Sequence, residues 1–304
     1  MTRLLAGNPA LQGHLAMLTF SALVAGSFLL GAQVAGEIAP AAINALRFAL
    51  AAIIIGIAAM ATGGIPRGAA RAPWRYLVLG GFFALYFLLM FEGLKTASAL
   101  NTSAVFTLTP VLSAGFGLVL LGQVTTRRMA LALAIGALGA VWVIFRGDWQ
   151  AARAMDIGRG EVIFFFGCVS HAVYTPLVRR LNRGERPLVF SFGMMIAGCL
   201  ILGLFGWQDL ATTDWAGLRP LVWITIGYLV VFASASTFVL LQFATMRLPS
   251  AKVMAYTYLT PSWVILLELA TGQGAPPALT LVGIALTVAA LALLLEKDPA
   301  APAR

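Results

Sequence analysis

ALNTSAVFTLTPVLSA, residues 99–114, and SAKVMAYTYLTPSWVI, residues 250–265, are the two stretches that decide the fold. The triplet Leu-Thr-Pro stands at 108–110 in the first and at 259–261 in the second, 151 positions later. Both copies lie inside long apolar runs. The sequence therefore predicts two related halves, each with an interrupted helix.

The interruption in each copy is a proline. Pro110 and Pro261 have no N–H to donate, so the carbonyls of Phe106 and Thr257, four residues earlier, lose a helical partner. Hydrocarbon cannot satisfy such carbonyls, and breaks of this kind survive where they are packed in protein or line a wet cavity. Paired interruptions in two halves indicate a transporter's binding site. A buried kink that serves packing alone is the alternative.

Composition places the chain in a membrane. Of its 304 residues 61% are hydrophobic and only 10% are charged, whereas about a quarter of a soluble domain is charged. The net charge is +9, and the basic residues lie in short loops between the apolar runs. This distribution is typical of a protein oriented in a membrane rather than of one that binds nucleic acid. We therefore expect the lipid bilayer, and no nucleic acid, as a partner.

The expected fold class is an all-α polytopic membrane protein with ten transmembrane helices. The expected spans are 13–33, 40–61, 74–94, 98–121, 128–145, 160–181, 188–206, 218–241, 250–270 and 278–295. Each is long enough to cross a bilayer core of about 30 Å. The first five form one repeat (13–145), a loop follows (146–159), the last five form a second repeat (160–295), and a polar tail ends the chain (296–304).

Five spans per half is an odd number, so the second half enters the membrane in the opposite sense and the repeats are inverted. Small residues at Ala132 and Gly139 recur at Gly283 and Ala290 on the last span. They predict a close helix contact, either within the bundle or between two copies of the chain. A monomer or a weak homodimer is expected.

Lysine and arginine set the orientation. Segments on the side of the N-terminus hold 14 of them and those on the other side hold 5, so both termini are expected in the cytoplasm and the protein in a bacterial inner membrane.

Several short motifs follow one another in the order found in a known family. Gly26-Ser27-Phe28, Asn44-x-x-Arg47-Phe48, the run at 93–99 and Ser170-His171-Ala172-x-Tyr174 stand on spans one, two, three to four and six. With the repeat, they resemble the EamA type of the drug/metabolite transporter superfamily. The resemblance implies a secondary carrier similar to bacterial exporters of amino acids, including aromatic ones. It also shows a departure, because Gln123 and Gln273 stand where the family often has glutamate.

The expected substrate site combines aromatic walls with a few hydroxyls, which suits an amino acid with an apolar or aromatic side chain. Thr102, Phe106, Thr109 and Ser113 share one face of span four. The other candidates lie on spans three, six, eight and nine: Tyr86, His171, Tyr174, Tyr228, Thr237, Gln242, Tyr256, Thr260 and Trp263. Each of these also has an ordinary interpretation, as a core aromatic or a hydroxyl bonded to its own helix.

Two ionisable residues lie well inside spans. Histidine ordinarily titrates near neutral pH, so His171 is a candidate for proton coupling, with a neutral packing role as the alternative. Arg47 is predicted to form a structural ion pair with Glu92 or Glu268, because a permanently charged guanidinium needs a standing partner. The alternatives are that Arg47 meets a substrate carboxylate near the outer mouth and that Glu92 pairs with Lys95.

Other function classes fit less well. The two histidines, His14 and His171, show no metal-ligand spacing, and Ser170 beside His171 makes a poor catalytic pair. We therefore expect no enzyme, no cofactor and no metal. A passive channel or facilitator, or a carrier of lipids or other metabolites, remains the alternative to an amino-acid exporter.

The orientation gives a first prediction. In intact cells, a membrane-impermeant thiol reagent should label single cysteines placed near Gly36 or Asp214, but not those near Arg183 or in the C-terminal tail. The physical reason is the excess of lysine and arginine on the inner side. Labelling of the tail from outside would contradict the ten-span topology.

Overall fold

The computed structural model describes residues 9–154 and 157–295, and in these ranges the chain is built of helices without strands. The first half contains α2 (Pro9–Val34), α3 (Pro40–Ala61), η1 (Arg67–Ala70), α4 (Trp74–Gly93), α5 (Ala99–Phe106), α6 (Thr109–Leu121) and α7 (Arg127–Ile144). The second half contains α9 (Arg159–Leu181), α10 (Pro187–Phe205), α12 (Pro220–Val230), η2 (Val231–Ser236), α13 (Thr237–Thr245), α14 (Ser250–Ala255), η3 (Tyr256–Leu259), α15 (Thr260–Ala270) and α16 (Thr280–Leu295). Short helices α8 (Trp149–Ala154) and α11 (Trp207–Thr212) lie in loops.

The expected fold class is confirmed. In the described part of the chain, nine helical segments are long and apolar enough to cross a membrane, and α16, with 16 residues, is a shorter tenth. Three of the nine are composite: α5 with α6, α12 with η2 and α13, and α14 with η3 and α15. The observed ends agree closely with the expected spans.

Local sequence explains most helix ends. Pro40 and Pro187 stand in the first turn of α3 and α10, where the missing N–H costs nothing. The side chains of Ser98 and Thr126 accept hydrogen bonds from backbone N–H groups at the start of α5 and α7. Gly122 ends α6 at φ 65°, a left-handed conformation that suits glycine.

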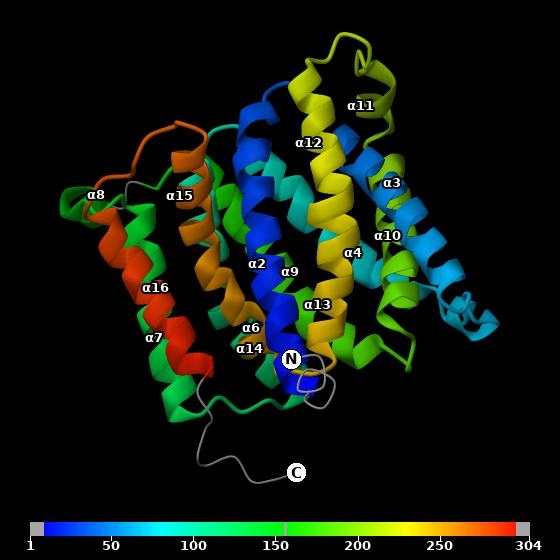
Figure 1. Cartoon of the computed structure of the whole chain (residues 1–304), viewed down its shortest axis with the longest axis horizontal. Coiled ribbons are helices and arrows are strands. Elements are labelled where there is room, and N and C mark those ends of the chain that lie inside the picture. Colours follow the sequence, from blue (N-terminus) through cyan, green and yellow to red (C-terminus); the bar gives the residue numbers. More distant parts are fainter. Residues whose placement is uncertain (1–8, 155–156, 296–304) are drawn as a thin grey trace.

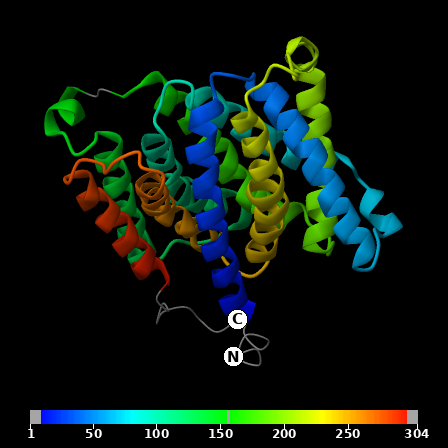
Figure 2. The ribbon, with the colours of Figure 1, turned by 45° about the horizontal axis from the view of Figure 1, so that its top comes forward.

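The helix pairing is that of an inverted repeat. Helices α7 and α16, the last of each half, pack on each other, as do α3 and α10, the second of each half (Figure 1). The contact between α4 and α9 has its counterpart between α2 and the segment α12 to α13. The first two pairings join equivalent helices of the two halves, and the third occurs twice, once with each half in each role. Figure 2 shows the same bundle from a second side.

Glycines set the closest approaches between the halves. A Cβ added to Gly139 of α7 would lie 2.7 Å from the carbonyl oxygen of Gly283 of α16, and the reverse distance is also 2.7 Å. Gly93 and Gly160 bring α4 and α9 together in the same way. The predicted small-residue contact is therefore found inside the bundle, where this face of α7 is already covered.

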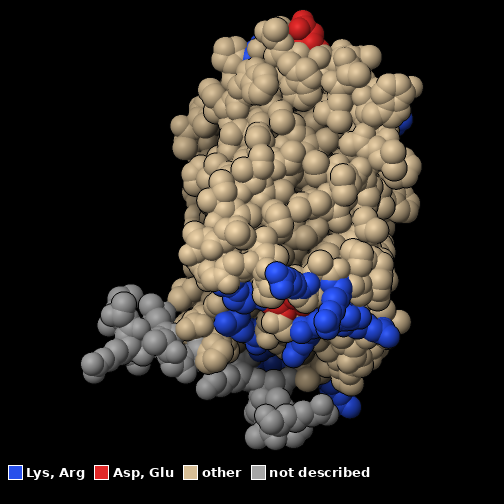
Figure 3. Space-filling model, turned by 90° about the vertical axis from the view of Figure 1, so that its right-hand side faces the viewer, with Lys and Arg blue, Asp and Glu red and all other residues tan. Residues whose placement is uncertain are grey.

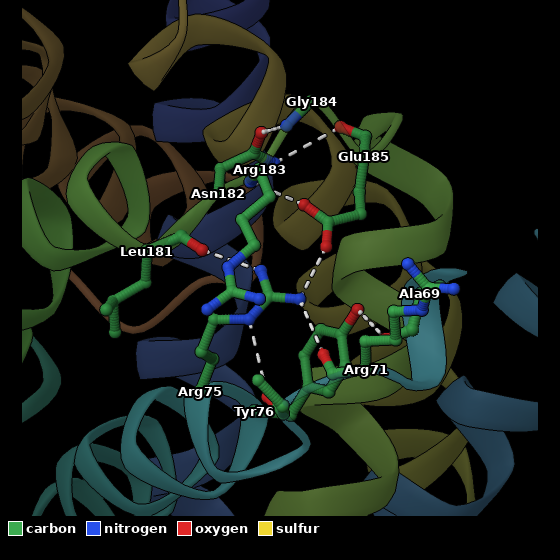
Figure 4. A network of polar contacts seen from close by, with 10 residues as sticks. Ala69, Arg71, Arg75, Tyr76, Leu181, Asn182, Arg183, Gly184 and Glu185 are labelled. Carbon is green, nitrogen blue, oxygen red and sulfur yellow. Dashed lines mark hydrogen bonds and ion pairs between the residues drawn. The ribbon is translucent and has the colours of Figure 1, made fainter. Parts of the chain in front are cut away.

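Basic residues gather at the end of the bundle where α2 begins and α16 ends, which we call the basic end; the opposite end is the far end. Figure 3 shows this concentration on one face of the molecule. Within it, Arg75 is almost fully buried and its Nη2 donates to Glu185 Oε1 at 2.6 Å, while its Nη1 donates to the Leu181 carbonyl at 2.7 Å (Figure 4). Partial burial disfavours the charge of Glu185, but the bonds from Arg75 and the Arg183 N–H outweigh it and lower the pKa of this carboxyl.

The glycine contact generates a second prediction. Replacing Gly139 with alanine should lower the melting temperature of the purified protein, because its new methyl group meets backbone that cannot move aside; such overpacking typically costs about 1–3 kcal/mol. Gly203 of α10 has open space around its Cβ position and is the matched control. Gly203→Ala should leave the melting temperature unchanged or raise it. Equal effects at the two positions would contradict the packing argument.

Candidate functional site

A cluster of aromatic rings occupies the centre of the bundle, and both halves contribute to it. Its members come from α4, α5, α9 and α13: Phe83, Tyr86, Phe87, Phe106, Phe164, His171, Tyr174 and Phe238. We call them the central cluster. All are buried. Because segments from the two repeats converge here at mid-depth, the cluster has the position expected of a transporter's substrate site.

His171 stands in the middle of the central cluster. Its ring lies 4.6 Å from Tyr86, 5.1 Å from Phe83 and 5.5 Å from Phe106, centroid to centroid. It is the thirteenth of the 23 residues of α9, about 18 Å along that helix. Neither ring nitrogen has a hydrogen-bond partner among the described residues. A buried imidazole without partners is uncommon, and an ionisable group inside a membrane span is a candidate for a functional role.

Polar groups flank the rings. Gln242 Nε2 donates to the Tyr174 hydroxyl at 3.0 Å, while Gln242 Oε1 is buried without a partner among the described residues. Thr237, one turn and a half earlier, is buried and donates to the Ser234 carbonyl at 3.4 Å. The structure thus brings together five of the predicted residues: Tyr86, Phe106, His171, Tyr174 and Gln242.

Arg47 is fully buried beside this cluster and the predicted ion pair is wrong. Neither Glu92 nor Glu268 contacts Arg47; its Nε donates to Ser234 Oγ at 2.5 Å and its Nη2 to the Ala233 carbonyl at 2.6 Å. Its guanidinium carbon lies 3.6 Å from the centroid of the Phe87 ring. Glu92 pairs instead with Lys95 at 2.6 Å, as the alternative held.

The partner of Arg47 is a helix defect that the sequence analysis did not find. Residues Val231–Ser236 form a π-helical stretch inside span eight, and both Ala233 and Ser234 lie in it. π-Helical turns inside α-helices are frequent at functional sites. The available signal was the run Ala-Ser-Ala-Ser at 233–236, four small residues within an otherwise bulky apolar span.

The paired prolines interrupt their helices as expected, but the expected free carbonyls are occupied. Helix α5 ends at Phe106 and α6 begins at Thr109, whose hydroxyl donates to the Phe106 carbonyl. In the second half η3 precedes Pro261, and the Thr260 N–H donates to the Thr257 carbonyl. Each break is therefore closed by a residue next to its proline, namely Thr109 and Thr260, and neither carbonyl is left without a partner.

The remaining hydroxyl candidates differ in their surroundings. Thr102 Oγ1 donates to the Ser98 carbonyl at 2.8 Å, which is the ordinary bond of a threonine to its own helix. The hydroxyls of Ser113 and Thr260 are buried without a partner among the described residues.

Three predicted aromatic residues lie elsewhere, along α2. The Tyr228 hydroxyl donates to the Leu23 carbonyl at 2.8 Å, and Trp263 Nε1 donates to Ser21 Oγ at 3.2 Å. The Tyr256 ring lies 6.0 Å from His14, centroid to centroid. These residues pack against the first helix and are not part of the central cluster.

Comparison with known proteins decides the family. The model of the EamA-like transporter family matches residues 11–145 and again residues 158–296. This chain belongs to the EamA-like transporter family. Its placement in the drug/metabolite transporter superfamily is thereby confirmed, and the two matches fall on the two halves.

Two relatives of this EamA-like transporter extend the comparison. The "Uncharacterized transporter YyaM" of Bacillus subtilis (strain 168) is 26% identical over 265 residues, which cover 85% of this chain and 86% of the relative. A solved structure described as "Crystal structure of protein" matches with a TM-score of 0.71 and 22% identity over 94% of this chain and 96% of its own. The latter likeness supports the fold.

The two ends of this EamA-like transporter differ. At the far end, a cavity of about 410 Å³ is lined by charged groups that include Arg146, Asp148 and Glu161. A second cavity, of about 280 Å³, shares Asn101 and Arg146 with the first and also reaches Glu268. Asn101 Nδ2 donates to the buried Glu161 carboxylate at 2.9 Å, a pair that the sequence analysis missed although Glu161 opens an apolar span.

At the basic end, Gln123 joins the two halves. Its Oε1 accepts a hydrogen bond from the Ser250 N–H at the start of α14, at 3.3 Å. Its counterpart at the far end, Gln273, donates to Thr271 Oγ1 at 3.2 Å instead. The smaller far-end cavity lies between Gln273 and Ser98, which precedes α5. Of the two glutamines, Gln123 thus makes a contact between the repeats at the basic end, whereas Gln273 lines a cavity at the far end.

Proposed function

We propose that this EamA-like transporter exports small metabolites, most readily amino acids with apolar or aromatic side chains, by alternating access. The observation that carries the proposal is the central cluster: aromatic rings from both repeats surround a histidine without a partner at mid-depth, next to a buried arginine. Rings supply apolar contact area, and Gln242, Tyr174 and Arg47 supply the polar groups that an amino acid requires.

The proposed orientation of the protein in the membrane follows from the distribution of its lysines and arginines. The basic end faces the cytoplasm of a bacterial inner membrane, because cytoplasmic loops carry the excess of lysine and arginine. In this orientation the far-end cavities open to the outside and the Gln123–Ser250 contact closes the inside. The described conformation is then the more open of the two at its outer end, and neither cavity reaches the buried central cluster.

Inverted repeats support alternating access because exchanging the conformations of the two halves produces the opposite opening. In that exchange Gln273 meets the start of α5, the place equivalent to Ser250, and the far end closes. A passive channel is the second candidate. It is less well supported, since the buried rings of Phe28, Phe106 and Phe164 pack against one another at the core of the bundle.

His171 is proposed to carry a coupled proton. Neither of its ring nitrogens has a partner among the described residues, so protonation would break no bond. The monomer contains both repeats and thus all parts of the proposed site.

The direct test is transport in proteoliposomes. Vesicles loaded with labelled L-phenylalanine should release it with saturable kinetics, and unlabelled L-phenylalanine outside should accelerate release. Phe83→Ala should raise KM about tenfold by removing a ring that contacts His171 and Tyr174, since a buried aromatic side chain contributes about 1.5–3 kcal/mol. Phe205, which is 83% exposed, is the matched control, and Phe205→Ala should behave as the parent. Release linear in concentration would favour the channel.

The glutamine pair tests alternating access. In a background with Cys168 and Cys199 replaced by serine, Leu100→Cys reports on the far-end cavity through its labelling by an impermeant maleimide. Gln123→Ala removes the basic-end contact and should slow labelling severalfold by favouring the opposite opening. The equivalent substitution in the other repeat, Gln273→Ala, should leave the labelling rate of Leu100→Cys unchanged or raise it. The same change in both variants would contradict the exchange.

A further inference from the structure

Among the described residues two arginines, Arg47 and Arg75, are fully buried, and they have different partners. Arg75 has a carboxylate, Glu185, 2.6 Å from its Nη2, at the edge of the bundle (Figure 4). Arg47 lies deep in the bundle and has no carboxylate within ion-pair distance among the described residues. A buried guanidinium is normally neutralised by an anion, because an unpaired charge is costly away from water.

The contacts of Arg47 hold it in place without neutralising it. Ser234 Oγ and the Ala233 carbonyl accept from Nε and Nη2, and Phe87 covers one face of the guanidinium. Asn44 Oδ1 lies 3.4 Å from Nη1, a long contact. A guanidinium has five N–H groups, and these three contacts use three of them. Donors are therefore left on a rigidly held cation, the arrangement that bidentate recognition of a carboxylate requires.

The position of Arg47 connects it to the central cluster. The guanidinium of Arg47 stacks on the ring of Phe87. That ring lies 5.1 Å from the ring of Phe83 and 4.7 Å from that of Tyr86, centroid to centroid. Arg47 lies seven residues from the far-end start of α3, and Tyr86 lies seven residues from the far-end terminus of α4, about 10 Å along each helix. The cation thus belongs to the wall of the aromatic cluster at the same depth.

We propose that Arg47 binds the anionic group of the transported molecule, which for an amino acid is its carboxylate. This inference rests on the proposed function and assigns the charge of its substrate. The unpartnered Gln242 Oε1 provides an acceptor for the ammonium group, and the rings take the side chain. The carrier then binds molecules that have an anionic group and binds amines of the same shape but without an anionic group more weakly.

The test compares three probes that share a phenyl ring: L-phenylalanine, 3-phenylpropionate, which lacks the ammonium, and phenethylamine, which lacks the carboxylate. Each is assayed as a competitor of labelled L-phenylalanine counterflow in proteoliposomes and by the shift in melting temperature of the purified protein. The parent should bind the two carboxylates and bind phenethylamine at least about tenfold more weakly. Arg47→Gln should weaken the carboxylates about thirtyfold or more, leave phenethylamine unchanged and so abolish the preference.

Two further variants separate binding from folding. Arg47→Lys keeps the charge and should restore part of the preference for carboxylates. Arg75→Gln, the matched control, should lower the melting temperature but leave the preference of the parent, because its partner is Glu185. A preference retained in Arg47→Gln would overturn the inference. If that variant does not fold, phenethylamine competing with the parent as well as L-phenylalanine would overturn it.

The two proposals fail in different ways. Transport of L-phenylalanine with an unchanged preference in Arg47→Gln would uphold the exporter and reject the anion site. Stabilisation of the parent, but not of Arg47→Gln, by 3-phenylpropionate without any transport of L-phenylalanine would uphold the anion site and reject the proposed substrate.

Discussion

Hydrocarbon offers no hydrogen-bond partner, so every backbone polar group inside the membrane has to be paired within the protein, and this structure depends on that constraint. Long helices obey it automatically, and three of the membrane segments depart from a continuous α-helix. In each case the protein supplies the missing partner. The Thr109 hydroxyl donates to the Phe106 carbonyl and the Thr260 N–H to that of Thr257, both nearby in the chain, whereas the Ala233 carbonyl accepts from Arg47 of the other half. The breaks are thus stable features that place irregular backbone in the interior of the bundle.

The same rule makes the interior charges informative. Arg47 and His171 lie among rings where every polar contact has to come from protein or ligand. Hydrogen bonds and the face of Phe87 offset much of the cost of burying the guanidinium, which insertion scales place at about 2.5–3.5 kcal/mol. These neutral contacts do not neutralise the positive charge of Arg47. A site of this kind interacts most strongly with a molecule that brings the opposite charge with it.

Sequence alone predicted the fold well because the signals were local and periodic. Apolar length, prolines in first turns and the Leu-Thr-Pro repeat set the spans and their inversion. Contacts that depend on helix phase were predicted less well. Tyr256 begins a 3₁₀ turn (Tyr256–Leu259) and Trp263 follows it, and both contact residues of α2 instead of the central cluster. The partner of Arg47 was missed because the π-helical turn at Val231–Ser236 leaves no periodic mark.

Helices α7 and α16 are the last helices of their halves, and they pack on each other through Gly139 and Gly283. Exchange of the two halves maps this pair of helices onto itself, so the two helices are neighbours before and after the exchange, although Gly139 then takes the place of Ala290 and Gly283 that of Ala132. The contact of Gln123 with Ser250, by contrast, has no equivalent at Gln273, which bonds to Thr271 instead. Under the proposed alternating access, the crossing of α7 and α16 acts as a fixed pivot. Strengthening or weakening it changes how firmly the two halves are joined without favouring either direction of access.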